Sequence, residues 1–126
     1  MKYNELVAAP TPKNIESFVL DKLYFQGEPV IEGFVRHRDN RPGLSRSAIG
    51  HLLPQKVLKR LQGNETRATI KKLLKDEAPE ALALFAKENE ATIRRLEKLS
   101  RTQPEEGTAF RTVVQRYPGF VPFYKK

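Results

Sequence analysis

Residues 79–101 read PEALALFAKENEATIRRLEKLSR, and their apolar side chains recur at the three-to-four-residue spacing of a helix. Pro79 suits the first turn of a helix, and Asp76 and Glu77 supply favourable negative charge just before it. We therefore expect one helix from about Pro79 to Arg101, roughly 22 residues long and the longest element of the chain. This helix should be the scaffold of the domain, with a buried face made of Leu82, Phe85, Ile93, Leu96 and Leu99.

The segment upstream predicts a second helix followed by an extended stretch. Thr11 can cap a helix that has Pro12 at its first position, and Gly27 is expected to end this helix after about residue 25. Val30 to Val35 should then be extended. A competing interpretation makes Phe18 to Gln26 a strand that pairs with Val30 to Arg36, because β-branched and aromatic residues are dense in both arms.

The middle of the chain predicts a loop and three short helices. Residues 38–45 contain several turn formers and are expected to be a loop. Ser45 or Ser47 can cap the first short helix, and Pro54 should break it or begin the next one. Asn64 is expected to cap the third helix, whose inward-facing residues are Ile70, Leu73 and Leu74.

The C-terminal region predicts one more helix and a tail. Phe110, Val113 and Val114 should face inward from the last helix, which Pro118 and Gly119 end. Residues 118–126 are expected to form an extended aromatic tail that folds back over the core or stacks against a ligand. The chain is thus expected to be mainly α, a single small domain of five to six helices with a short extended or hairpin element near residues 20–36.

The composition excludes several classes of site. The chain has 126 residues and no cysteine, so disulfide frameworks, thiolate metal sites and cysteine nucleophiles are absent. No apolar run reaches the roughly 18 to 20 residues that a membrane helix needs, and no secretory signal is visible. We expect a cytoplasmic protein with no membrane association, no metal and no cofactor, and a binding protein rather than an enzyme.

The charge of the chain is concentrated in one segment. The formal net charge is +8, and residues 36–62 alone carry 7 basic and 1 acidic side chains, a net of +6. A focused positive field attracts polyanions, because Lys and Arg side chains that neutralise phosphates release condensed counterions. The sequence therefore predicts a nucleic-acid interface at Arg36, Arg38, Arg41, Arg46, Lys56, Lys59 and Arg60. A basic stripe along the following helix is a possible extension of this interface, formed by Arg67, Lys71 and Lys75.

Two other functions use the same residues. A protein–protein adaptor or inhibitor could turn the basic surface toward an acidic protein partner. A small metal-independent ribonuclease could use His37 or His51 as acid and base, with Arg38, Arg41 and Arg46 stabilising the transition state. His37 and His51 are the only histidines, and neither has the carboxylate spacing of a metal site. The primary prediction remains a non-enzymatic protein that binds DNA or RNA.

Overall fold

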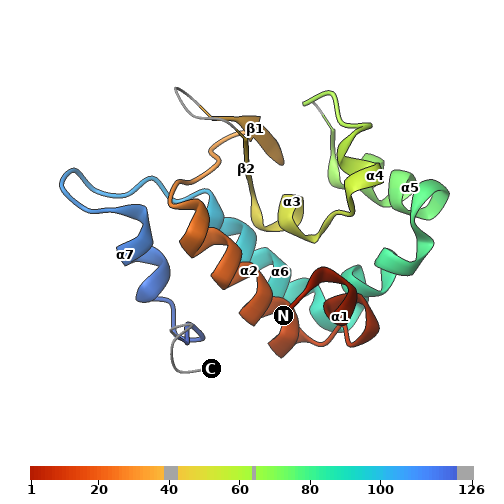
Figure 1. The fold of residues 1–126 in the computed structure, drawn as a ribbon, viewed down its shortest axis with the longest axis horizontal. Helices are drawn as coiled ribbons and strands as arrows, with labels where there is room; N and C mark the ends of the chain where they lie inside the picture. Colours follow the sequence, from red (N-terminus) through yellow and green to blue (C-terminus); the bar gives the residue numbers. More distant parts are fainter. Residues whose placement is uncertain (39–42, 64, 122–126) are drawn as a thin grey trace.

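The computed structural model describes residues 1–38, 43–63 and 65–121 of the chain. They form a mainly helical domain with one two-stranded antiparallel hairpin (Figure 1), as the sequence predicted, although the helical residues are divided among more and shorter helices than expected. In chain order the elements are α1 (Tyr3–Ala8), α2 (Pro12–Gln26), β1 (Val35–His37), β2 (Leu44–Arg46), α3 (Ala48–Leu52), α4 (Gln55–Leu58), α5 (Arg67–Glu77), the 3-10 helices η1 (Pro79–Phe85) and η2 (Lys87–Asn89), α6 (Glu90–Ser100) and α7 (Phe110–Gln115).

Helix α2 is the longest helix among the described residues, and its ends confirm the sequence signals. The Thr11 Oγ1 accepts a hydrogen bond from the Asn14 N–H at 3.2 Å, Pro12 occupies the first turn, and Gly27 ends the helix with a left-handed φ of 76°. The competing strand interpretation of Phe18 to Gln26 is therefore wrong. The helix buries Ile15, Phe18, Val19, Leu20 and Leu23 against α3, α6 and α7.

The expected single helix from Pro79 to Arg101 is not formed, and this prediction is wrong. The stretch divides into η1, η2 and α6, with an extended backbone at Ala86. The physical reason is Asn89, whose buried Nδ2 donates to the carbonyl oxygens of Pro10 (2.9 Å), Leu84 (3.2 Å) and Ala83 (3.4 Å). An asparagine amide that satisfies these backbone carbonyls competes with the helical hydrogen-bond ladder. Helix α6 is left with 11 residues and α2, with 15, is the longer scaffold.

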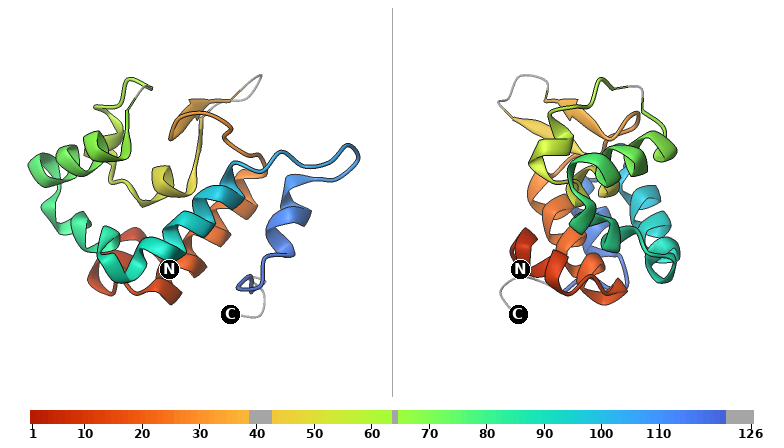
Figure 2. Two further views of the ribbon diagram at one scale, coloured as in Figure 1. Left: turned by 180° about the vertical axis from the view of Figure 1, so that it is seen from behind. Right: turned by 90° about the vertical axis from the view of Figure 1, so that its right-hand side faces the viewer.

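Helices α2 and α6 run side by side, and the hairpin and α4 stand on the same side of this pair (Figures 1 and 2). The core includes the inward faces of α2 and α6 together with Ile49 and Leu52 of α3 and Leu74 of α5. No helix among the described residues has both the length and the apolar character needed to cross a membrane.

The hairpin lies later in the chain than expected. Strand β1 pairs with β2 in the register Val35↔Arg46 and His37↔Leu44, so the predicted loop over residues 38–45 is wrong for Leu44 and Ser45. The Gln26 side chain explains why this polar stretch is a strand. Its Oε1 accepts from the Arg46 N–H at 2.8 Å, and its Nε2 donates to the Arg46 carbonyl oxygen at 3.1 Å. The amide thereby pairs with β2 much as a neighbouring strand would.

The helices after the hairpin follow the sequence signals in part. The Ser47 Oγ accepts from the Gly50 N–H at 3.2 Å and caps α3, as predicted, and Pro54 precedes α4. Helix α5 is capped by Thr66, whose Oγ1 accepts from the Thr69 N–H at 3.3 Å. The predicted cap, Asn64, lies outside the described residues. Asp76 and Glu77 are the last residues of α5, and the 3-10 helix η1 follows them from Pro79.

Helix α7 packs against α2 and buries Phe110 and Val114, whereas Val113 is partly exposed. After the helix, the Phe120 ring lies 5.5 Å from the Tyr24 ring, measured between centroids. Phe120 is thus part of the apolar cover of α2. The remaining aromatic residues of the expected tail, Phe123 and Tyr124, lie outside the described residues, so the extended tail stays a prediction.

Candidate functional site

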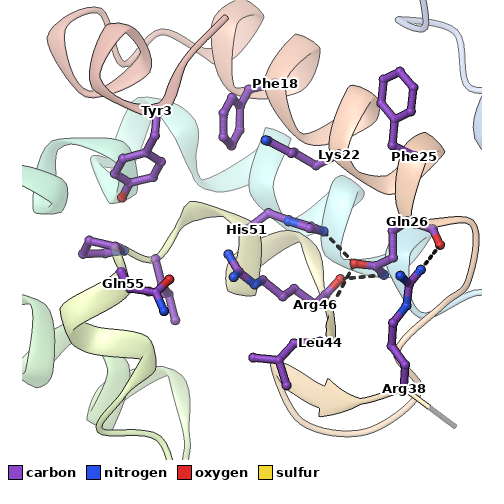
Figure 3. Close-up of a pocket in the computed structure, with 12 residues that line it drawn as sticks. Tyr3, Phe18, Lys22, Phe25, Gln26, Arg38, Leu44, Arg46, His51 and Gln55 are labelled. Atoms are coloured by element: carbon purple, nitrogen blue, oxygen red, sulfur yellow. Dashed lines mark hydrogen bonds between the residues drawn. The ribbon is translucent and has the colours of Figure 1, made fainter. Parts of the chain in front are cut away.

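A cavity of about 560 Å³ opens between α2, the hairpin and the turn from α3 to α4. Its lining combines cations with aromatic rings, and none of its described lining residues is an acid (Figure 3). The lining consists of Tyr3, Phe18, Lys22, Phe25, Gln26, Arg38, Leu44, Arg46, His51, Leu53, Pro54 and Gln55. Two of the predicted phosphate-binding residues, Arg38 and Arg46, are therefore brought to one cavity.

Gln26 is the centre of the hydrogen-bond network on the cavity wall. Its buried amide nitrogen donates to two carbonyl oxygens, those of Glu28 (2.8 Å) and Arg46 (3.1 Å). These two acceptors fix which end of the amide is the oxygen. The Gln26 Oε1 therefore accepts a hydrogen bond from the His51 Nε2–H at 2.9 Å. One side chain thus joins the end of α2, strand β2 and helix α3.

His51 is a neutral histidine held between two cations. Figure 3 shows its imidazole between Lys22 of α2 and Arg46 of β2. Burial, together with the nearby charges of Arg46 and Lys22, lowers the pKa of His51 to about 3. Because Nε2 donates to Gln26, the other ring nitrogen carries no proton at neutral pH. In this tautomer Nε2 is a hydrogen-bond donor and Nδ1 is a hydrogen-bond acceptor.

Arg38 has a mainly structural role in this cavity wall. Its Nε donates to Glu28 Oε1 at 2.6 Å, and its Nη2 donates to the Gln26 carbonyl oxygen at the end of α2. The same Glu28 Oε1 accepts from the Ser45 hydroxyl at 2.5 Å. These contacts hold the hairpin against the C-terminus of α2, where a cation is also favoured by the helix dipole. Much of the Arg38 charge is consequently satisfied within the protein.

Arg46 differs from Arg38 because its guanidinium has no carboxylate partner among the described residues. Its backbone is held on both sides by Gln26, and its side chain extends into the cavity below His51 (Figure 3). Burial lowers the pKa of Arg46, which means that the surroundings penalise its charge. A partly buried, uncompensated guanidinium is a site at which an anion would be stabilised.

The aromatic residues of the cavity have different exposures. Phe18 is 4% exposed, and Lys22 Nζ lies 5.3 Å from its ring centroid, so the ring supports the lysine by a cation–π contact. Tyr3 donates its hydroxyl to the Leu52 carbonyl oxygen at 2.6 Å, and burial raises its pKa. Phe25, in contrast, is 59% exposed at the rim. Phe25 is thus the most exposed of the aromatic residues that line the cavity.

A second hollow of about 520 Å³ adjoins the cavity and shares Tyr3, Pro54 and Gln55 with it. Lys56 of α4, Lys59 directly after it and the acid Glu80 line this hollow. Lys56 Nζ lies 3.7 Å from Glu80 Oε1, an exposed and weak pairing. Lys56 and Lys59 therefore lie next to the cavity that contains Lys22 and Arg46.

The other predicted interface residues are more scattered. Arg36 is exposed on β1, Arg41 lies outside the described residues, and Arg60 Nη2 pairs with Glu77 Oε1 at 3.1 Å. The possible extension lies on α5, where Arg67 and Lys71 border a small pocket with Phe85 and Lys75 is exposed. The positive charge of residues 36–62 is thus partly neutralised by acids from other parts of the chain. Carboxylates from outside that segment, Glu28, Glu77 and Glu80, pair with three of its cations.

The two histidines of the ribonuclease alternative are not brought together. His51 lines the cavity, whereas His37 lines a different hollow between β1 and the loop after α4. No group of three or more potential metal ligands occurs among the described residues. The structure therefore gives no pair of histidines placed to act as acid and base in one site.

Sequence reasoning missed Lys22, Phe25 and Gln26. The signal that could have found two of them is a stripe on α2, because Phe18, Lys22 and Phe25 stand at positions i, i+4 and i+7. An exposed aromatic and a lysine on one helical face indicate a binding surface as readily as a solvated face. Gln26 has no such signal, because its role depends on contacts with residues 20 and 25 positions away.

Comparisons of this chain with protein-family models, with curated protein sequences and with solved structures found no match.

Proposed function

We propose that this protein binds nucleic acid, and that phosphate groups of the backbone enter the cavity to reach Arg46. The observation that carries the proposal is the partly buried Arg46 guanidinium, which has no carboxylate partner among the described residues. Burying a charge without a counter-ion is costly, and a phosphate would supply the missing anion through two parallel N–H···O bonds.

A polymeric anion suits the arrangement better than a single small one. Lys22 and Arg46 lie in the cavity, and Lys56 and Lys59 lie in the hollow that adjoins it. Cations spread along two connected hollows can contact successive phosphates of a backbone, and each contact releases counterions. Arg38 contributes by positioning β2, since its own charge is largely satisfied by Glu28.

The proposal predicts binding that weakens steeply as salt increases. Fluorescence anisotropy of a labelled 12-nucleotide single strand and its 12-base-pair duplex would be measured between about 50 and 200 mM salt. Lys22→Gln should weaken binding and reduce the slope of log K against log salt by about 0.7 to 0.9, the value of one phosphate contact.

Lys13→Gln is the matched control, because Lys13 is an exposed lysine of the same helix and does not line the cavity. It removes the same charge and should leave the slope closer to that of the wild type. Absence of binding to either oligonucleotide at low salt would overturn the proposal. An acidic protein would be attracted by the same cations, so polyglutamate serves as a competitor. Displacement of the oligonucleotide by an equal concentration of polyglutamate charges would favour the adaptor function instead.

A further inference from the structure

We propose that the cavity selects single-stranded nucleic acid by holding one unstacked nucleotide, with its phosphate on Arg46 and Lys22 and its base against Phe25. This inference rests on the proposed function and names the form of nucleic acid that the same site would take. It makes a different prediction from phosphate attraction alone, because phosphates are present equally in single strands and duplexes.

The guanidinium of Arg46 lies below the surface of the cavity wall. Arg46 is partly buried, with Gln26 holding its backbone and His51 beside its side chain, so a phosphate must enter the cavity to reach the guanidinium. A space of about 560 Å³ is of the size that holds one small organic ligand. A single strand can turn one nucleotide into such a space, whereas a duplex keeps its phosphates on a rigid outer surface.

The rim of the cavity carries an aromatic residue. Phe25 stands one helical turn after Lys22 on α2, and its ring is 59% exposed. Its ring and the Tyr24 ring are T-shaped to each other, with centroids 5.7 Å apart. Leu44, 37% exposed, adds apolar surface on the hairpin side of the opening. An aromatic ring beside phosphate-binding cations is the recurring arrangement by which proteins stack the bases of single strands.

The other aromatic residues of the cavity are held in its wall. Phe18 lies in the core and carries Lys22 over its ring, and Tyr3 is fixed by its hydrogen bond to Leu52. Neither ring can be offered to a base without rearranging the wall. A base in this cavity would therefore stack on Phe25, and a duplex, whose bases are stacked on one another, would have none to offer.

The test compares Phe25→Ala with wild type on a labelled 12-nucleotide single strand, on its duplex and on a 12-nucleotide abasic strand with the same phosphates. Wild type should bind the single strand more tightly than the duplex or the abasic strand. Phe25→Ala should lose about tenfold in affinity for the single strand and change little on the other two. Phe25→Tyr should keep the wild-type affinity, because tyrosine preserves the ring face.

Ile31→Ala is the matched control, since Ile31 is an exposed apolar residue, 43% exposed, that does not line this cavity. Thermal unfolding of each variant verifies that it folds. Equal affinity of wild type for the three oligonucleotides, or an equal loss on all three in Phe25→Ala, would overturn the inference while leaving phosphate binding intact. Loss of all binding at low salt would overturn the proposed function and the inference together.

Discussion

Replacing Arg46 with glutamine separates a binding residue from a structural one. The guanidinium of Arg46 is partly buried, has no carboxylate partner among the described residues, and has a pKa lowered by burial. Glutamine keeps a polar side chain but removes the penalised charge. Because solvent screens part of the penalty and the arginine stem also packs, we expect the free energy of unfolding to change between zero and about +1 kcal/mol.

The same substitution should weaken binding substantially. A hydrogen bond between a guanidinium and a phosphate contributes about 1.5 to 3 kcal/mol, so the affinity for a single strand should fall roughly tenfold to a hundredfold. The slope of log K against log salt should also fall by about 0.7, because one phosphate contact is lost. If the substitution preserves stability but lowers affinity, Arg46 serves binding and does not stabilise the fold.

Two measurements test this expectation. Urea unfolding followed by circular dichroism gives the free energy of unfolding, and fluorescence anisotropy over a salt series gives the affinity and its slope. Arg94→Gln is the control, because Arg94 is an exposed arginine on α6 that lines none of the cavities described above. If Arg46→Gln lowers the free energy of unfolding by about 2 kcal/mol or more and leaves the affinity unchanged, Arg46 stabilises the fold and does not bind phosphate.

Three further predictions concern the framework of the site. The pKa of His51, lowered to about 3 from 6.5, means that its contribution to stability is complete above pH 6.5 and decreases as the pH falls toward 3. At pH 5 the buried neutral His51 should lower the free energy of unfolding by about 2 kcal/mol, so the stability of His51→Gln in urea unfolding should fall less steeply below pH 6.5 than that of the wild type. Gly50→Ala should lose about 2 to 4 kcal/mol in the same assay, because the added Cβ would lie 2.2 Å from the Phe34 carbonyl oxygen; a change below 0.5 kcal/mol would contradict this close contact. Arg111→Gln should lower the free energy of unfolding by about 1 kcal/mol, since Arg111 donates to the last carbonyl oxygens of α2 at 2.9 and 3.3 Å, and an unchanged midpoint would show that this cap is dispensable.

The parts of the fold that the sequence predicts are those set by neighbouring residues. Thr11, Pro12 and Gly27 begin and end α2 through local backbone geometry, and Ser47 caps α3 in the same way. The broken helix over residues 79–101 could not be predicted, because its interruption depends on the Asn89 amide reaching a carbonyl oxygen on Pro10, 79 residues away. Apolar periodicity continues through the break and gives no sign of it.

The candidate site shows the same division between local and distant causes. The charge density of residues 36–62 led to Arg46, but it could not distinguish that residue from Arg38, whose partner Glu28 lies in another segment. Lys22 belongs to residues 1–35, which carry 3 basic and 5 acidic side chains, and it reaches the same cavity as Arg46 only in the folded chain. Which cations remain available to a ligand is decided by tertiary contacts.

The most direct test of the cavity as the binding site is a two-dimensional ¹H–¹⁵N NMR titration with the 12-nucleotide single strand at low salt. The backbone amides of Lys22, Arg46 and His51 should shift progressively and saturate together, because they line one cavity. Those of Arg94 and Lys98 on α6 should stay in place, since α6 does not line the cavity. Saturating shifts confined to α6, with the cavity amides unmoved, would contradict the assignment of the site.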